Sequence, residues 1–203
     1  MVSLRNATSA DEQLFVDTLE AAFADDPVHL YLARPGPKRG PGLRAFCRVL
    51  FRLYARQNLE TVWIADEGAG VIVWLPPGGW NVSWWQEAPA LPDYIRFLGW
   101  SGVMRGLRFG GAIDGAHPAE PHWYLQIVGV RPDQQGHGVG RALIQPMLDR
   151  FDERGELAYL ESSKLDNVPY YERLGFDALG QIEMDDDAPP VMRMQRRPRL
   201  TLG

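Results

Sequence analysis

The sequence has 203 residues, of which 45% are hydrophobic and 23% charged, proportions typical of a soluble globular protein. Its 21 Lys and Arg against 26 Asp and Glu give a net charge of −5, which disfavours a nucleic-acid partner. A single cysteine excludes an internal disulfide, metal-ligand patterns are missing, and the apolar runs are too short to span a membrane. We expect one cytoplasmic domain over residues 1–203, with no metal and no membrane association.

The first part of the chain alternates helical and extended patterns. Ser9, Asp11 and Glu12 form a capping-box pattern that predicts a helix start, and Asp25-Asp26-Pro27 predicts its end. A Pro- and Gly-rich stretch then indicates a loop. The expected elements, in chain order, are a strand over 2–7, a helix over 9–24, a loop over 34–42, a helix over 43–57, and a hairpin made by 61–65 and 71–75.

The segment 80–121 is the least regular part of the sequence and is expected to be a variable helical region. It holds four tryptophans, and helical spacing runs from 93 to 109. A strand over 122–130 follows, and simple alternation places Trp123, Leu125 and Ile127 on one face. The elements expected after it are a helix over 138–154, a strand over 157–161, a short helix over 167–174, and an antiparallel pair over 176–184 and 191–196.

The strand, helix and strand over 122–161 form a βαβ unit, so its two strands should be parallel neighbours. The remaining strands form hairpin-like patterns, which predicts a mixed α/β sheet with helices on both faces. A glycine-rich turn, 135–140, joins the first strand of this unit to its helix. That order gathers unpaired N–H groups at the positive end of a helix dipole, which is a site for phosphate.

The spacing of the turn distinguishes it from two common phosphate loops. Gly140 is followed by Arg141 and Ala142 rather than Lys and Ser/Thr, and the glycines lack the G-x-G-x-x-G spacing. Instead the turn resembles motif A of the GNAT superfamily of acyl-CoA-dependent acetyltransferases. Downstream, Tyr-Glu-Arg-Leu-Gly-Phe at 171–176 resembles motif B of that superfamily. Segments 23–27, 73–77 and 122–176 are similar to its puromycin N-acetyltransferase-like branch, and the similarity is weakest over 80–120, where substrate contacts would differ.

The resemblance implies a GNAT fold and acetyl-CoA as co-substrate. The fold has a mixed, mostly antiparallel sheet with one parallel pair that splays apart, here at 126–130 and 158–161. The backbone of Val128 and Val130 is then expected to bind the pantetheine arm, while Asn167 bonds its thioester end, caps a helix, or does both. The residues implied for the pyrophosphate are Gln135, Gly136, His137, Gly138, Val139, Gly140 and Arg141.

The resemblance also assigns catalytic roles for direct transfer of an acetyl group to the primary amine of a small molecule. Tyr171 is implied as the proton donor to the leaving thiolate, with Tyr170 packing the short helix. Tyr124 stands where histone-type relatives carry a glutamate base, so the base is left open among Glu161, His122, Tyr124 and a water relay.

Other features leave alternatives open. Asp185, Asp186 and Asp187 either attract a cationic amine or, as we favour, form a solvated loop. A non-catalytic acyl-CoA sensor with the same fold is the alternative function, and a homodimer is compatible with the sequence. His29, His117 and His137 fall in no pattern that predicts a role.

Overall fold

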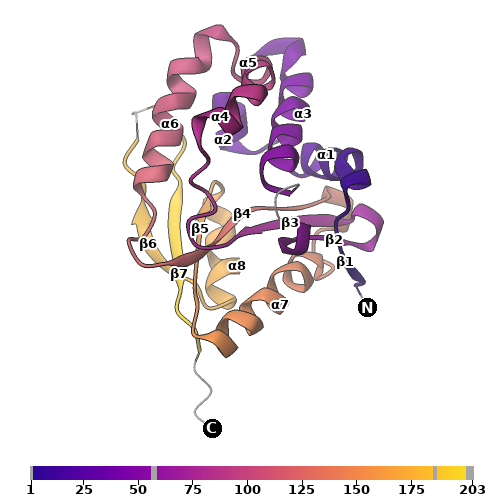
Figure 1. The fold of residues 1–203 in the computed structure, drawn as a ribbon, viewed down its shortest axis with the longest axis vertical. Coiled ribbons are helices and arrows are strands. Elements are labelled where there is room, and N and C mark those ends of the chain that lie inside the picture. The colour runs from indigo at the N-terminus through magenta and orange to yellow at the C-terminus, as the bar shows by residue number, and fades with distance from the viewer. Residues whose placement is uncertain (1, 56–58, 185–186, 200–203) are drawn as a thin grey trace.

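The computed structural model describes residues 2–55, 59–184 and 187–199. It contains a seven-stranded sheet in the order β1-β2-β3-β4-β5-β7-β6 (Figure 1). The strands are β1 (Leu4–Asn6), β2 (Val62–Ala65), β3 (Gly70–Leu75), β4 (His122–Val130), β5 (Leu157–Ser162), β6 (Asp177–Gln181) and β7 (Met192–Arg196). Only the β4–β5 pair is parallel among these neighbours, which confirms the predicted mixed, mostly antiparallel sheet.

Helices cover both faces of the sheet, as the alternating patterns predicted. Figure 1 shows α1 and α3 on one side, and α7 and α8 on the other. The helices are α1 (Glu12–Ala22), α2 (Pro27–Leu32), α3 (Arg39–Leu50), α4 (Trp84–Glu87), α5 (Leu91–Leu98), α6 (Val103–Gly115), α7 (Val139–Arg154) and α8 (Val168–Arg173). None of the helices within the described ranges is long and apolar enough to span a membrane.

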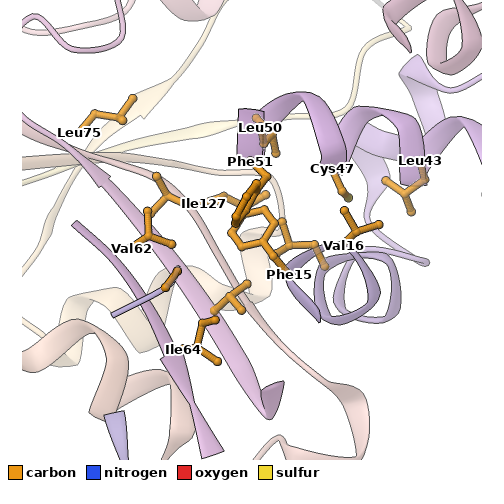
Figure 2. Close-up of a cluster of buried hydrophobic side chains, with 14 of the residues drawn as sticks. Phe15, Val16, Leu43, Cys47, Leu50, Phe51, Val62, Ile64, Leu75 and Ile127 are labelled. Carbon is orange, nitrogen blue, oxygen red and sulfur yellow. The ribbon is translucent and has the colours of Figure 1, made fainter. Parts of the chain in front are cut away.

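One of two apolar clusters among the described residues lies between α1, α3 and the sheet (Figure 2). Phe15 of α1 and Phe51, just beyond α3, are fully buried, with ring centroids 5.2 Å apart. They meet Val62 and Ile64 of β2, whose side chains point to this face because residues two apart in a strand share a face. Burial of each such side chain stabilises the fold by about 1.5–3 kcal/mol.

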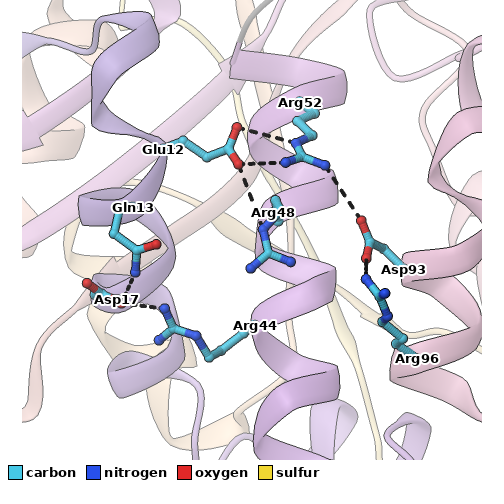
Figure 3. A network of polar contacts seen from close by, with 8 residues as sticks. All are labelled: Glu12, Gln13, Asp17, Arg44, Arg48, Arg52, Asp93 and Arg96. Carbon is cyan, nitrogen blue, oxygen red and sulfur yellow. Dashed lines mark hydrogen bonds and ion pairs between the residues drawn. The ribbon is translucent and has the colours of Figure 1, made fainter.

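Salt bridges join the helices that cover this face (Figure 3). Arg52 contacts Glu12 of α1 at 2.9 Å and Asp93 of α5 at 3.8 Å, and Arg96 contacts Asp93 at 2.8 Å. Because the arginine side chains are half exposed or more, each exposed pair contributes no more than about 1 kcal/mol. The network therefore orients α1, α3 and α5 more than it stabilises them.

Two predicted boundaries near the N-terminus are wrong. The capping box begins at Thr8 rather than Ser9, since the backbone N–H of Thr8 donates to the Asp11 carboxylate at 2.7 Å, and Ser9–Asp11 forms a 3-10 turn before α1. The loop predicted over 34–42 is helical from Arg39. Pro41 is tolerated there because N–H groups in the first turn have no intrahelical partner.

Two glycines explain why the predictions for α3 and for the helical region at 93–109 were wrong. Gly42 lies where α3 crosses α5, and a Cβ there would come within 2.8 Å of the Arg96 carbonyl oxygen. It is a contact glycine rather than a loop residue. Gly99, with φ of +68°, ends α5 and separates it from α6, so the single helical stretch predicted there is two helices.

The parallel pair β4–β5 is short. His122, Trp123 and Tyr124 pair with Leu157, Ala158 and Tyr159, and the pairing ends there. The predicted splay is therefore confirmed, but it begins later on β5 than predicted, because Ala158 and Tyr159 are still paired with β4.

A β-bulge on β4 lies next to the point where the strands separate. Val73 of β3 pairs with Ile127, and Trp74 with Leu125, so Gln126 is the extra residue. A bulge bends its strand and reverses the inward and outward alternation that follows. Ile127 accordingly packs on the α1 face with Tyr124, and its predicted place beside Trp123 and Leu125 is wrong.

Candidate functional site

Beyond the bulge, one backbone edge of β4 faces the gap between the separated strands. The Arg131 N–H donates to the carbonyl of Ala69, the residue just before β3, at 2.9 Å. Because alternate residues of an antiparallel strand direct their backbone groups to opposite edges, those of Val128 and Val130 face the gap. The Gln135 side chain donates to the Val130 carbonyl at 3.2 Å. This hydrogen bond connects the glycine turn to the end of β4.

The glycine turn has the conformation that an anion site requires. Gly136 and Gly138 have φ of +78° and +82°, and a Cβ at either position would meet nothing within 4 Å, which leaves open space beside the backbone. The first hydrogen bond of α7 runs from the Ala142 N–H to the Gly138 carbonyl. The N–H groups of 139–141 therefore have no partner within the helix, and the helix dipole adds positive potential there.

A buried hydroxyl lies against this turn. The Tyr170 hydroxyl oxygen has no hydrogen-bond partner among the described residues, and a Cβ on Gly140 would come within 2.9 Å of it. Buried hydroxyl groups are normally hydrogen-bonded, so this one is available to a group bound beside the turn. Tyr170 packs against Tyr171, as expected, but the sequence did not indicate that its hydroxyl reaches the turn. The turn, this hydroxyl and the open strand edge together fit the pyrophosphate and pantetheine of a CoA thioester.

Replacing Gly138 with alanine is expected to weaken acetyl-CoA binding about tenfold, because a non-glycine residue in the left-handed region costs roughly 1–2 kcal/mol and shifts the turn. Gly155 at the other end of α7 has φ of +68° and open space around it, which makes Gly155→Ala a matched control. Calorimetric titration with acetyl-CoA should show weakened binding only for Gly138→Ala, while both variants lose similar stability in urea. Equal affinities would contradict the assignment of the turn.

Short helix α8 carries the tyrosine predicted as the proton donor. Tyr171 is buried in the cluster that includes α7, with its ring centroid 6.0 Å from that of Phe176. Burial raises the pKa of Tyr171 above its usual value, which keeps the phenol protonated at neutral pH. Asn167 occupies the N-cap position of α8 but makes no capping hydrogen bond, and its side chain is exposed.

Glu161 lies on the opposite face of the sheet, beyond Tyr159, the last residue of β5 that pairs with β4. Its side chain is only 5% exposed, and it is flanked by Tyr124 and Tyr159, which belong to the cluster on the α1 face. Burial raises the pKa of Glu161 to about 7, although both tyrosines lower it in part. Its Oε1 atom is buried and has no hydrogen-bond partner among the described residues.

Two histidines extend from this carboxylate in a chain of contacts. His117 Nε2 lies 3.7 Å from Glu161 Oε1, His117 Nδ1 lies 2.9 Å from His122 Nε2, and His122 Nδ1 lies 2.7 Å from the Glu120 carbonyl oxygen. A carbonyl only accepts, so His122 carries its proton on Nδ1 and accepts at Nε2 from His117. The remaining nitrogen of neutral His117, Nε2, therefore presents a lone pair to Glu161.

Trp80 covers both imidazole rings. Its ring centroid lies 4.5 Å from that of His117 and 4.3 Å from that of His122, and both pairs are stacked. Burial lowers the pKa of His117 to about 4 and also lowers that of His122, so both rings are neutral at neutral pH. No role was predicted for His117 from the sequence. The other three tryptophans of this region, Trp84, Trp85 and Trp100, are 76%, 62% and 79% exposed.

The connection between α1 and α2 is fixed to the end of β5. Asp26 is buried, caps α2 through the His29 N–H at 3.0 Å, and accepts a 2.5 Å hydrogen bond from Ser163. Lys164 pairs with Asp25 at 2.7 Å. Asp25 and Asp26 therefore hold the end of α1 against the residues that follow β5, in addition to ending the helix. Of the three aspartates at 185–187, only Asp187 lies within the described residues, and it accepts from Tyr31 at 3.3 Å.

Comparisons with known proteins agree with this geometry. Residues 62–176 match the model of the acetyltransferase (GNAT) family. The chain is 29% identical to an uncharacterized N-acetyltransferase of Schizosaccharomyces pombe, over 97% of this chain and 84% of that protein. A crystal structure described as histone acetyltransferase HPA2 and related acetyltransferase, from Corynebacterium glutamicum, superposes with a TM-score of 0.71 at 29% identity, covering 100% of this chain and 99% of that one. The NatC complex bound to Gag peptide and CoA shares the fold, with a TM-score of 0.57 at 14% identity, covering 98% of this chain and 99% of that chain.

Proposed function

Because the chain belongs to the acetyltransferase (GNAT) family, we propose that it transfers the acetyl group of acetyl-CoA directly to the primary amine of a small molecule. One observation carries the proposal. Glu161 lies on the α1 face of β5 and has a pKa raised to about 7, while Tyr171 belongs to the apolar cluster on the opposite face and stays protonated. Transfer of an acyl group to an amine needs one group of each kind.

The residues that would hold acetyl-CoA are the gap-facing backbone of Val128 and Val130, the turn 135–141, and the Tyr170 hydroxyl. When bound, acetyl-CoA supplies an activated thioester carbonyl. Trp80, Tyr124 and Tyr159 pack on the Glu161 side and would exclude water from it. Asn167 is retained as a candidate for a bond to the pantetheine end.

Glu161 is the base that this arrangement favours. An attacking amine must lose a proton, and a carboxylate whose pKa is about 7 accepts one near neutral pH. Tyr124 is unsuited because burial raises its pKa and keeps its phenol protonated. Both nitrogens of His122 are already engaged. His117 presents an unprotonated nitrogen to Glu161 at 3.7 Å, which is beyond hydrogen-bond distance, so His117 is a neutral neighbour of this carboxylate.

Tyr171→Phe is expected to lower kcat about 10- to 100-fold while acetyl-CoA affinity stays unchanged, because only proton donation to the leaving thiolate is lost. Tyr170→Phe is the neighbouring comparison, and it should weaken acetyl-CoA binding with a smaller effect on kcat. Stopped-flow thiol release and calorimetric titration separate the two results. A normal kcat for Tyr171→Phe would remove this residue from the chemistry.

Purified protein incubated with acetyl-CoA and a panel of primary amines tests the activity itself. The resemblance to the puromycin-modifying branch supports including aminonucleosides in the panel. Release of free thiol that depends on the amine, with the acetylated amine identified by mass spectrometry, is the expected result. Intact acetyl-CoA binding with no amine-dependent thiol release would instead favour a non-catalytic acyl-CoA sensor.

A further inference from the structure

The connection between α1 and α2 crosses from one separated strand to the other on the α1 face of the sheet. At one end it lies against β4, because a Cβ on Gly129 would come within 3.1 Å of Ala22 Cβ and 3.2 Å of Phe23 Cε2. At the other end, Asp26 accepts a 2.5 Å hydrogen bond from Ser163, just beyond β5. Both anchor points lie past the paired part of β4 and β5, so this connection spans the gap.

Asp26 uses its two carboxylate oxygens for different partners. Its Oδ1 accepts from the His29 N–H at 3.0 Å and from His29 Nδ1 at 2.9 Å, which caps α2. Its Oδ2 accepts from the Ser163 hydroxyl. Capping a helix needs only one side-chain oxygen, which serine or asparagine also supplies, so capping does not explain the second bond. Although burial raises the pKa of Asp26, the bonds from His29 and Ser163 lower it below its ordinary value, so the carboxylate is ionised at neutral pH.

The second bond acts on β5 close to Glu161. Ser163 lies two residues beyond Glu161, and residues two apart in an extended chain share a face. The Asp26–Ser163 hydrogen bond therefore reaches β5 from the face that carries the Glu161 side chain. Past Tyr159, β5 pairs with β7 on one edge and faces the gap on the other. The bond thus supports the end of β5 where its pairing with β4 has ended.

The groups assigned above to acetyl-CoA lie on other elements than Glu161. Val128 and Val130 belong to β4, the glycine turn precedes α7, and Tyr170 belongs to α8. The thioester would therefore be placed from β4, whereas the base is placed from β5. Because the ladder between the two strands ends at Tyr159, their alignment depends on what holds the strands at a fixed separation farther along.

We propose that Asp26 is a positioning residue that fixes the separation of β4 and β5 and so aligns the Glu161 carboxylate with the thioester. The inference rests on the proposed function, since it concerns the same reaction and site. A second contact, Lys164 to Asp25 at 2.7 Å, lies beside it, but Asp25 is 81% exposed and this pair contributes little. Asp26 is 1% exposed, so its bond to Ser163 is shielded from water and is the stronger of the two.

Ser163→Ala tests the inference, because it removes the bond across the gap and leaves the cap of α2 intact. Its kcat for amine acetylation should fall about 10- to 100-fold, since displacement of a reacting group by about 1 Å can cost that much. Its Kd for acetyl-CoA should change less than about threefold, because the groups assigned to acetyl-CoA stay in place. A wild-type kcat, or equal losses of kcat and acetyl-CoA affinity, would overturn the inference.

A second readout needs neither acetyl-CoA nor an amine. Carbon-13 NMR of the glutamate carboxyl carbons follows the titration of Glu161 in the free protein, with Glu161→Gln assigning its signal. Burial raises the pKa of Glu161 to about 7, so an end of β5 that is held less firmly should admit water and lower this pKa toward the ordinary value of glutamate. An unchanged pKa in Ser163→Ala would show that the bond does not hold this end of β5, and would overturn the inference.

Asp26→Ser examines the other partner of the bond. Serine still caps a helix, but its single, shorter oxygen cannot serve both His29 and Ser163. The variant should lose as much kcat as Ser163→Ala, and the double variant should lose no more than either single variant. Losses that multiply in the double variant would overturn the inference. If Asp26→Ser does not fold, the kcat, Kd and Glu161 pKa of Ser163→Ala still decide.

Thr18→Val is the matched control. It removes a buried hydroxyl through which α1 donates to the Gly68 carbonyl at 3.0 Å, away from the gap, and it keeps the shape of the side chain. It should keep the wild-type kcat and the wild-type pKa of Glu161. An equal loss of kcat in this control would show that any weakened contact of α1 has the same effect, which would overturn the role of Asp26.

The failure of this inference differs from the failure of the proposed function. Amine acetylation that is unchanged in Ser163→Ala leaves the acetyltransferase intact and removes only the positioning role of Asp26. Absence of amine-dependent thiol release in the wild type, while acetyl-CoA still binds, removes the proposed function and with it the inference. The NMR titration separates the two, because it reports whether Asp26 holds the end of β5 without any turnover.

Discussion

Replacement of Glu161 by glutamine is expected to lower kcat/KM for amine acetylation by about 100- to 1000-fold at pH 8, the range typical of a lost general base. Glutamine has nearly the same shape but cannot accept a proton, so the affinity for acetyl-CoA should not change. In the wild type, kcat/KM should rise as the pH increases through about 7, because Glu161 becomes ionised there. The variant should lose this rising limb.

The control for this experiment is Glu153→Gln, which changes an exposed carboxylate on α7 outside the site and should retain both the rate and the pH profile. His117→Asn provides a second comparison. It removes the nitrogen that faces Glu161, so it should alter the pH at which the rising limb appears more than it alters acetyl-CoA affinity. If Glu161→Gln keeps the wild-type profile, the proton leaves the amine by another route, such as a water relay.

The parts of the site that depend on local sequence could be predicted. A glycine turn between a strand and a helix depends on backbone conformation over a few residues, and the positive φ angles of Gly136 and Gly138 agree with that prediction. Tyr171 was implied by the resemblance of a short motif, and its role stays a prediction. The order of strand, turn and helix also sufficed to predict the parallel pair, which the structure confirms.

The parts that depend on contacts between distant segments could not be predicted. The bulge at Gln126 exists only in the pairing of β4 with β3, so alternation along β4 alone placed Ile127 on the wrong face. Trp80 and His117 are far apart in the sequence, and their stacking arises only when the segment between β3 and β4 folds back on the sheet. A lone histidine and one of four tryptophans in a segment give no pattern that predicts such a contact.

The proton balance of Glu161 and His117 leads to a second large expected effect, on stability. The folded pair holds one proton at mildly acidic pH, on the carboxyl, because the pKa of Glu161 is raised to about 7 and that of His117 is lowered to about 4. The unfolded pair also holds one proton there, but on the histidine, because the ordinary pKa of glutamate is lower than that of histidine. The two states bind equal numbers of protons, so this pair adds almost no pH dependence to wild-type stability.

Each single replacement should expose the contribution of the other residue. In Glu161→Gln, the lowered pKa of His117 means that its contribution to stability is present above about pH 6.5 and is lost as the pH falls toward 4. In His117→Asn, the raised pKa of Glu161 means that its contribution is present below about pH 4.5 and is lost as the pH rises through 7. Relative to wild type, the two slopes have opposite signs.

Urea unfolding between pH 4.5 and 8 measures these slopes. Each variant should diverge from wild type by about 1–3 kcal/mol across this range, since one pKa unit corresponds to about 1.4 kcal/mol. Other paired carboxylates, such as Asp26 and Asp152, titrate in all three proteins, so they cancel when each variant is compared with wild type. In the double variant, the difference in the free energy of unfolding from wild type should not change with pH. Parallel slopes for the two single variants would contradict the opposite pKa shifts of Glu161 and His117, and the case for Glu161 as a base that titrates near neutral pH would fail with them.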